Sequence, residues 1–353
     1  MKRLLTGKTA IFHDYFDEIG GAEITLLVLA RALNVPIITT SIDKKTVREL
    51  GYDDVAFLSV GSVPTIRHVR QIMAKWRFFR CDFSGEFDFF IFGGGGSVFA
   101  SARHRPNLWY CFSPERGLYD LRDRTRFGLK KLVKELLIIL DKHFAKQIET
   151  IVAPSGNVRS RIRKYYNRNS EIIHSPVSTG QFYFRPPGDY WLCVTRIDPY
   201  KRLELQLAAF KKLPQEKLLI VGPQGNSAYF TALKQTCPEN VFFYGPVYET
   251  GKLTELYARC RGLIATSLDE DFGMTPVEAM ASGKPVIAPN EGGYRETVAD
   301  GLTGRLIDRI DPDRLAQAIT EMGRYPEKYR EACLKRAGKF DRQVFIGKLK
   351  RFL

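Results

Sequence analysis

The sequence contains no long hydrophobic run. None of its apolar stretches approaches the ~20 residues that a membrane-spanning helix needs, so we expect no such helix in the 353 residues. The apolar run after Lys2 and Arg3 is too short for a secretory signal, and we therefore expect a cytoplasmic protein. The six cysteines are scattered without a Cys-x-x-Cys pair, which predicts reduced thiols rather than zinc ligands or structural disulfides.

Several ligand-binding motifs are also missing. The glycine run from Gly93 to Gly96 lacks the Gly-Lys-Ser/Thr ending of a P-loop, which favours a tight loop over a phosphate site. No Asp-x-Asp pair stands out as a metal site, so we expect no metal. No nucleic-acid-binding motif is evident, and because positive charge alone has other partners, we expect no nucleic-acid partner.

The positive charge is confined to part of the chain. The formal net charge is +15, yet residues 183–330 contain 19 basic and 19 acidic residues. The excess therefore lies outside this range, mostly in three clusters, at Arg67 to Arg80, Arg122 to Lys146 and Arg159 to Lys164. Such a distribution favours contact of the first half of the chain with an anionic membrane surface.

Apolar segments of strand length and of helix length alternate along the chain, which is long enough for two domains. Buried strands are expected at 9–12, 35–38, 55–58, 87–92, 107–111 and 150–153, with helices between them. This alternation predicts a parallel sheet covered on both faces. A short polar segment with a proline predicts a linker at 176–182 between domains at 1–175 and 183–330.

The most informative segment runs from Gly262 to Glu296. An apolar run of strand length is followed by Asp-Glu-Asp-Phe-Gly-Met, and the next residues begin like a helix. Thr275 is a suitable N-cap, Pro276 suits the first helical position and Gly283 suits the C-terminal cap. Another buried strand begins at Val286, so the segment predicts a strand-loop-helix-strand unit.

The loop of this unit is a candidate ligand site, because ligands bind where the carboxyl end of a strand meets the N–H groups of the next helix. Four residues are placed to offer backbone donors to an anion: Phe272, Gly273, Met274 and Thr275. Glu270 and Glu278 flank this turn and suit a ligand with hydroxyl groups. The alternative for Glu278 is a capping box, in which it accepts from the backbone N–H of Thr275.

Two other loops carry patterns typical of ligand binding. Gly20 and Gly21 precede an apolar helix at 22–33, where glycine admits a ligand close to the backbone and the helix dipole favours an anion. Arg196 and Lys201 follow a strand at 191–195 and are well placed for a diphosphate. The alternative is an ordinary Gly-Gly turn for the first loop and an ordinary solvated loop for the second.

These motifs together resemble the retaining GT-B glycosyltransferases of family 4, also called glycosyl transferases group 1, and in particular their bacterial and archaeal surface-polysaccharide mannosyltransferase branch. Glu270 and Glu278, with seven residues between them, match the E-x7-E signature of that family. Arg196 and Lys201 match its Arg-x-x-x-x-Lys pair. The resemblance covers nearly the whole chain and is strongest over 190–300.

The resemblance implies a role for each matching residue. Glu270 and the turn after it would hold the donor sugar, and Glu278 would accept from the ribose hydroxyls. Arg196 and Lys201, together with the turn at Gly20 and Gly21, would bind the donor diphosphate. The nucleotide base would lie against the residues after Gly245, among them Val247.

A segment of the first domain departs from the pattern of this branch. Residues 108–121 resemble Tyr-Cys-His-Thr-Pro-x-Arg-x-x-Tyr/Trp-Asp and keep four of its residues: Pro114, Arg116, Tyr119 and Asp120. Phe112 replaces the histidine that would offer a hydrogen bond to the donor sugar. With Asp14 and Arg116, it is expected on the acceptor or sugar side. The substitution leaves open a catalytically impaired subunit or sensor that binds a nucleotide sugar.

Leucine, isoleucine and lysine residues are interspersed between Phe127 and Lys146. One interpretation, favoured by this helix alone, is a core helix with one solvated face. The other is a basic amphipathic surface that lies on anionic lipid. The confinement of the charge to one half of the molecule favours some membrane contact.

The resemblance implies an α/β protein of the GT-B fold, with two Rossmann-like parallel-sheet domains facing a central cleft. The first domain would bind the acceptor, the second the donor, and a C-terminal helix at 331–353 would return to the first. The implied activity is retaining, metal-independent transfer of a hexose, with mannose favoured, from GDP-mannose or a UDP-sugar. The acceptor would be a glycan or a polyprenyl-linked glycan of polysaccharide biosynthesis, reached from the cytoplasm or the inner face of the plasma membrane.

Overall fold

The computed structural model describes residues 8–120 and 129–353, which form two compact units. The first unit comprises the chain up to Ser175 together with Phe345–Leu353, and the second comprises Pro176–Val344. Each unit has its own parallel sheet and its own buried hydrophobic residues. The α/β class with two Rossmann-like units is therefore confirmed.

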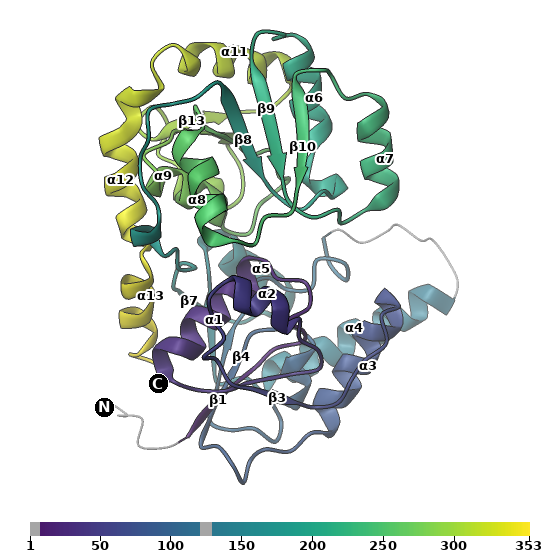
Figure 1. The fold of residues 1–353 in the computed structure, drawn as a ribbon. Helices are drawn as coiled ribbons and strands as arrows, with labels where there is room; N and C mark the ends of the chain where they lie inside the picture. The colour runs from purple at the N-terminus through teal and green to yellow at the C-terminus, as the bar shows by residue number, and fades with distance from the viewer. Residues whose placement is uncertain (1–7, 121–128) are drawn as a thin grey trace. The chain divides into compact units, whose positions relative to one another are not determined.

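The first unit is built on a sheet of seven parallel strands within the described residues (Figure 1). These strands are β1 (Thr9–Phe12), β2 (Ile37–Thr39), β3 (Phe57–Ser59), β4 (Phe89–Phe92), β5 (Asn107–Tyr110), β6 (Thr150–Ala153) and β7 (Glu171–Ile172). Their order is β3-β2-β1-β4-β5-β6-β7. The strand order thus reverses between β1 and β4, and open α/β sheets bind ligands at such a point.

Two clusters of buried side chains fill this unit. Side chains alternate along each strand, and in β1 this places Ala10 and Phe12 in one cluster and Ile11 in the other. The helices of the unit are α1 (Gly21–Leu33), α2 (Lys44–Glu49), α3 (Arg67–Arg80), η1 (Ser97–Ala100), α4 (Leu129–Lys146) and α5 (Gly156–Tyr166). Helix α5 begins at a side-chain cap: the Ser155 hydroxyl accepts a hydrogen bond of 3.0 Å from the Val158 N–H.

The C-terminal segment returns to the first unit later than expected. The return was expected over 331–353, but it begins at Phe345, within α13 (Arg342–Leu349). Phe345, Leu349 and Leu353 are buried among the residues of the first unit, and the Phe345 ring lies 5.6 Å from that of Tyr110. The expected boundary is wrong because α12 (Arg330–Ala337) packs on the second unit, where Cys333 is buried.

The second unit has a sheet of six parallel strands in the described chain. They are β8 (Tyr190–Val194), β9 (Lys217–Val221), β10 (Val241–Gly245), β11 (Leu263–Ile264), β12 (Val286–Pro289) and β13 (Gly304–Ile307). Their order is β10-β9-β8-β11-β12-β13, so the strand order reverses between β8 and β11. The α-helices are α6 (Leu203–Lys211), α7 (Ser227–Gln235), α8 (Thr250–Arg259), α9 (Met274–Ala281), α10 (Tyr294–Thr297), α11 (Pro312–Gly323) and α12.

The segment expected as a linker, 176–182, is packed into the second unit. The Val177 N–H donates to the Phe340 carbonyl at 2.9 Å, and the Thr179 hydroxyl donates to the Asp341 carboxylate at 2.6 Å. These contacts join the first residues of the unit to the last residues before the return. The boundary between the units therefore lies at Ser175.

Candidate functional site

The candidate residues of the second unit follow the carboxyl ends of neighbouring strands. Arg196 and Lys201 come after β8, Glu270 comes after β11, and Val247 comes after the outer strand β10. Because β8 and β11 pair directly, their loops meet at the point where the strand order reverses. The fold thus brings together residues that lie 69 positions apart in the sequence.

Lys201 and Glu270 form an ion pair at this point. The Lys201 Nζ atom lies 2.9 Å from Glu270 Oε2, and the two side chains are 15% and 19% exposed. Burial by itself lowers the pKa of Lys201, but the charge of Glu270 and its hydrogen bond outweigh burial and raise that pKa above its ordinary value. The raised pKa keeps Lys201 protonated beside the Glu270 carboxylate, at the point where the strand order reverses.

Arg196 lies in the same loop and is more exposed. Its Nε–H donates to Asp198 Oδ2 at 2.5 Å, and its Nη2 group donates to the Tyr200 hydroxyl at 3.2 Å. The guanidinium side chain is 45% exposed. It is held in place by its neighbours while part of it faces solvent, as a residue that binds an external anion must be.

The helix expected after this loop begins two residues earlier than the sequence indicated. Its N-cap is Gly273, with a left-handed φ of 90°, and not Thr275, which lies inside α9. Phe272 is buried, and its ring lies 5.5 Å from that of Phe340. Only the backbone of Phe272 is therefore suited to a ligand, whereas Met274 and Thr275 are half-buried at the start of α9.

Glu278 does not close a capping box. Its Oε2 atom accepts a hydrogen bond of 2.5 Å from the Tyr257 hydroxyl of α8, and no side-chain cap is present at the start of α9. Burial raises the pKa of Glu278, while the Tyr257 hydrogen bond lowers it, and the effect of burial is larger. The capping alternative is wrong, because a partner from another helix orients this carboxylate.

Two glycines allow the loop after β12 to approach Glu270 closely. A Cβ atom on Gly292 would lie 2.6 Å from the backbone N and O of Glu270, and one on Gly293 would lie 2.5 Å from Phe272 Cα. The Gly293 N–H donates to the Glu270 carbonyl at 2.7 Å. Gly292 and Gly293 therefore pack directly on the backbone of Glu270 and Phe272.

Sequence reasoning missed two residues that support this site. The buried Tyr294 places its hydroxyl 3.4 Å from Glu270 Oε2. Arg202 donates to the Thr266 and Ser267 carbonyls at 2.6 and 3.0 Å and pairs with Glu291. Only the position of Tyr294 directly after Gly292 and Gly293 could have suggested its role from sequence.

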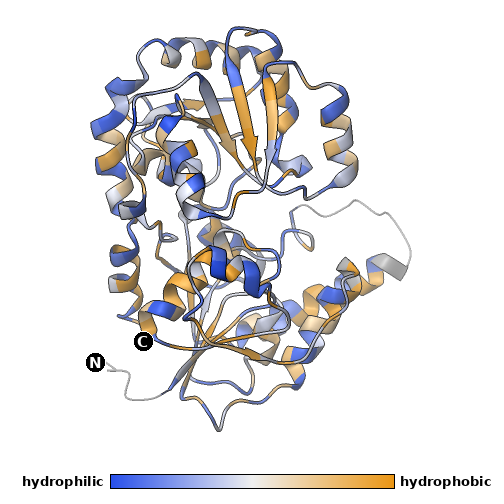
Figure 2. Cartoon of the chain, in the orientation of Figure 1, coloured by the Kyte–Doolittle hydropathy of each residue, from blue (hydrophilic) through white to orange (hydrophobic). Residues whose placement is uncertain are grey.

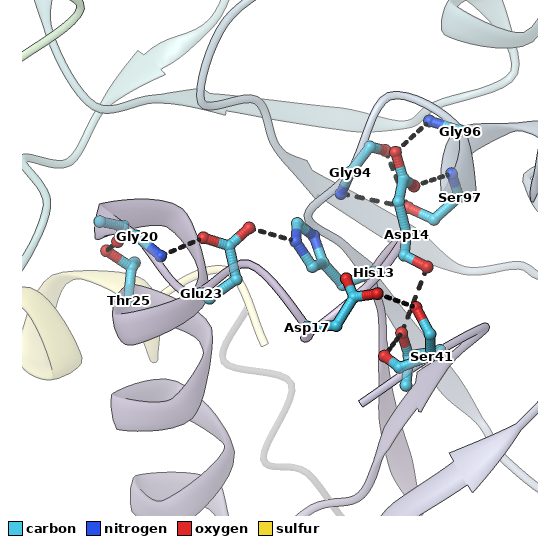
Figure 3. Close-up of polar contacts among 12 residues, drawn as sticks. His13, Asp14, Asp17, Gly20, Glu23, Thr25, Ser41, Gly94, Gly96 and Ser97 are labelled. Atoms are coloured by element: carbon cyan, nitrogen blue, oxygen red, sulfur yellow. Dashed lines mark hydrogen bonds and ion pairs between the residues drawn. The ribbon is translucent and has the colours of Figure 1, made fainter. Parts of the chain in front are cut away.

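In the first unit, Gly20 and Gly21 form the exposed start of α1, beside a hydrogen-bonded chain (Figure 3). Glu23 accepts from the Gly20 N–H at 2.8 Å and contacts His13 Nε2 at 2.9 Å. His13 Nδ1 is buried and has no hydrogen-bond partner within the described residues. The buried His13 was not among the expected site residues, although its position at the end of β1 places it at the reversal point of this sheet.

Asp14, expected on the acceptor or sugar side, holds a loop of its own unit. Its carboxylate accepts from the Gly96 and Ser97 N–H groups at 2.9 and 2.6 Å (Figure 3). A Cβ atom on Gly94 would lie 2.2 Å from Asp14 Oδ1, and one on Gly93 would lie 2.4 Å from a methyl group of Leu26. The glycine run therefore wraps the Asp14 carboxylate, which explains a tight loop without a phosphate.

Phe112 and Arg116 follow β5, and both have partners in the first unit. The half-buried Phe112 ring packs against Tyr110, with ring centroids 4.9 Å apart. The Arg116 Nε–H donates to Asp120 Oδ2 at 3.0 Å. Phenylalanine thus extends the hydrophobic cluster at the position where the resembled branch carries histidine.

The Glu270 loop contains an Asp-x-Asp pair. Asp269 and Asp271 have this spacing on either side of Glu270, whereas no such pair was expected from the sequence. Within residues 8–120 and 129–353, no group of three His, Cys, Asp or Glu side chains is arranged to hold a metal ion. The Glu270 side chain of this segment is instead joined to Lys201.

Comparison with protein families identifies the second unit. The family model described as Glycosyl transferases group 1 matches residues 184–340. Residues 184–340 are a glycosyl transferases group 1 domain. This domain contains the Lys201–Glu270 pair, α9 and Glu278. The resemblance to the family, inferred from those residues, is confirmed.

Two known proteins are similar in sequence to part of this chain. D-inositol 3-phosphate glycosyltransferase of Segniliparus rotundus is 32% identical over 162 residues, which cover 42% of this chain and 35% of that protein. The match thus spans about a third of that relative. The O-antigen chain mannosyltransferase RfbU of Salmonella typhimurium is 26% identical over 267 residues, covering 64% of this chain and 74% of RfbU.

The fold of the whole chain has a counterpart among solved structures. Anabaena Alr3699/HepE, in complex with UDP and glucose, superposes with a TM-score of 0.78 over 98% of this chain and 99% of HepE, at 18% identity. A likeness at this identity shows a shared fold. The GT-B class expected from the sequence is thus confirmed for a chain whose group 1 domain forms its second unit.

Proposed function

We propose that this chain is a retaining glycosyltransferase that moves a hexose, with mannose favoured, from a nucleotide-diphosphate sugar to a glycan or a polyprenyl-linked glycan. The Lys201–Glu270 pair carries the proposal, because it places a cation and a carboxylate 2.9 Å apart at the reversal point of the sheet. A donor with an anionic diphosphate and a hydroxyl-rich sugar needs both kinds of group. The start of α9 adds backbone donors beside them.

In this proposal, the diphosphate is bound by Arg196, Lys201 and the backbone N–H groups at the start of α9. The resemblance to the family implies that the turn at Gly20 and Gly21 also binds the diphosphate. Fixed donors of this kind stabilise the negative charge that develops on a leaving diphosphate. The proposed reaction therefore needs neither a metal ion nor a cofactor.

The transfer step breaks the bond between the anomeric carbon and the diphosphate oxygen. The acceptor hydroxyl forms the new bond on the same face of the sugar, and a diphosphate oxygen takes its proton. Glu270 orients the sugar and does not attack it, and the hydrogen bonds from Lys201 and Tyr294 hold its carboxylate in place. Glu278, oriented by Tyr257, accepts from the ribose hydroxyls, and Val247 lies against the base.

The identity of the donor defines the first experiment. HepE was solved with UDP and glucose, and RfbU is named as a mannosyltransferase, so UDP-sugars and GDP-mannose are the donors to compare. A bound donor raises the melting temperature of the protein. We expect one of these donors to do so and to release its nucleoside diphosphate when an acceptor is added. If GDP-, UDP- and ADP-sugars all leave the melting temperature unchanged, the proposal fails.

A second candidate is a subunit or sensor that binds a nucleotide sugar without transferring it. Phe112 favours this alternative, because its ring packs against Tyr110 and offers no hydrogen bond to a sugar. Isothermal titration calorimetry separates the two functions. Donor binding without hydrolysis or transfer, in the presence of glycan and polyprenyl-linked acceptors, supports the sensor.

A further inference from the structure

Helix α3 carries apolar side chains on its exposed face as well as on its buried face. Its buried residues include Ala74 and Phe78. Four other apolar residues, at the helical spacing of a second stripe, are 44–48% exposed: Val69, Ile72, Trp76 and Phe79. A helix that only covers a sheet has one apolar stripe and a polar opposite face, so α3 has an apolar surface for which the sheet provides no partner.

Helix α4 repeats this arrangement. Its buried side chains include Phe144 and Ala145, near its C-terminal end. Leu132, Leu136 and Ile139 are 68%, 55% and 64% exposed. The core-helix interpretation of this segment is therefore wrong for these residues; residues 127–128 lie outside the described chain.

The two apolar stripes belong to one region of the first unit. The Phe79 ring of α3 lies 6.0 Å from the Phe144 ring of α4, and both helices pack on η1. In Figure 2 both helices carry hydrophobic segments next to hydrophilic ones. We refer to the exposed side chains of Val69, Ile72, Trp76, Phe79, Leu132, Leu136 and Ile139 as the α3/α4 face.

The charge around the α3/α4 face is almost entirely positive. The sequences of α3 and α4 contain ten Lys and Arg residues against two Asp and Glu residues. Two of the bases, Arg70 and Lys75, are largely buried and paired with Asp17 and Glu115, so eight contribute to the excess. One of the two acids, Asp141, is buried under the Tyr119 and Tyr166 hydroxyls. The basic side chains of Arg80, Lys142 and Lys146 are exposed next to the apolar stripes. The face therefore combines an apolar centre with a cationic border.

We propose that the α3/α4 face docks on an anionic lipid bilayer, with its apolar side chains inserted among the acyl chains and its basic side chains at the headgroups. This combination is the one that interfacial amphipathic helices use, and Trp76 is of the residue type enriched at that depth. A second copy of this face is a poor partner, because it would bring like charges together. No helix among residues 8–120 and 129–353 could span a bilayer.

Flotation of the full chain with lipid vesicles tests this proposal independently of any transfer reaction. We expect binding to vesicles of phosphatidylcholine with phosphatidylglycerol, weaker binding to phosphatidylcholine alone, and release at high salt. The variant I72S/W76S/L136S/I139S should bind at least about tenfold more weakly, because apolar area contributes to interfacial binding. These side chains are exposed, so its melting temperature should stay near that of the parent.

A charge comparison locates the binding surface. The variant K142Q/K146Q removes two exposed basic residues of α4, each worth roughly fivefold in affinity near an anionic surface. Its matched control, R159Q/R163Q, removes two exposed basic residues of α5 and should change binding by less than about twofold. Equal losses in the two variants would show attraction without a docking face and would overturn the proposal.

Two further outcomes would contradict the proposal. Unchanged vesicle binding by I72S/W76S/L136S/I139S would mean that this face is not inserted. Sedimentation velocity without lipid would assign the face to a second copy if the parent forms a dimer that this variant abolishes. The expected result is a parent that shows no such dimer and floats with anionic vesicles.

Discussion

The two units use the same sheet topology at their reversal points for different purposes. In the second unit, the loops after β8 and β11 place Lys201 against Glu270, two charges that are only partly buried. In the first unit, the Asp14 carboxylate after β1 accepts from the Gly96 and Ser97 N–H groups. The first arrangement leaves charged groups at the edge of the sheet, and the second satisfies its charge with the backbone of its own unit.

The two units also differ in net charge. The family model matches residues 184–340, where basic and acidic residues nearly balance. The first unit and the C-terminal tail hold the excess positive charge, part of it on α3 and α4. A parallel sheet therefore fixes where a site can form, while the loop residues decide whether that edge binds a ligand or stabilises the unit.

The largest expected effect is a loss of transfer rate on replacing Glu270, whereas Asp14, the corresponding carboxylate of the first unit, is expected to be structural. Replacing Glu270 with alanine should lower the transfer rate at least about a hundredfold, because the sugar loses its orienting group. Steady-state assays with the donor found by thermal shift measure this effect. The variant E321A, in the exposed part of α11, is the control and should keep the parental rate. Parental activity in Glu270→Ala would remove Glu270 from the site.

The next effect concerns the close approach of the loops in the second unit. Gly293→Ala would place a Cβ atom 2.5 Å from Phe272 Cα, a backbone contact that cannot relax cheaply. We expect a loss of about 2–3 kcal/mol in the free energy of unfolding, measured by urea denaturation. Gly251→Ala is the control, because no heavy atom lies within 4 Å of the added Cβ. Equal stability of the two variants would contradict the proposed packing.

The Asp14 carboxylate offers the converse test in the first unit. Asp14→Ala leaves the N–H groups of Gly96 and Ser97 without their acceptor, which should cost about 1–3 kcal/mol of unfolding free energy. Donor affinity, measured by calorimetry, should remain within about twofold of the parent if Asp14 is structural. Asp53→Ala, at an exposed position, is the stability control. A stable Asp14→Ala variant that fails to bind would place Asp14 in the site.

The smallest expected effect concerns two carboxylates, Glu278 and Asp141, that accept hydrogen bonds from tyrosine hydroxyls. Burial raises the pKa of Glu278 in the second unit and of Asp141 in the first. Because the folded-state pKa is raised, each carboxyl contributes stability at low pH that is lost as the pH rises from its unfolded pKa through its folded pKa. Glu278→Gln should remove that part of the pH dependence and weaken donor binding about tenfold.

The matched variant in the first unit is Asp141→Asn. It should also flatten the dependence of stability on pH, but we expect donor affinity to stay within about twofold of the parent, because Asp141 is buried among residues of its own unit. Chemical denaturation across the pH range and calorimetry measure the two quantities. A loss of affinity in both variants would show that affinity follows stability and not the role of Glu278.

The sequence by itself located β1 to β6 to within about two residues, because buried parallel strands and amphipathic helices have distinct periods. It did not predict β7 or β13. It also predicted Arg196, Lys201 and Glu270 as candidate site residues, because they lie in loops after strands and match family motifs. It could not assign the partner of Glu278, because Tyr257 lies 21 residues away on another helix. A capping box and a tyrosine contact are equally compatible with the local sequence.

Only the tertiary structure decided which apolar and charged residues have partners. Leu132, Leu136 and Ile139 have the spacing of a core helix, yet α4 turns them outward because Phe144 and Ala145 supply its buried contacts. The return of the chain begins at Phe345 and not at 331, because α12 fits against α9. The physical reason is the same in both cases: burial depends on which distant elements pack together, whereas local sequence specifies only the periodicity of the candidates.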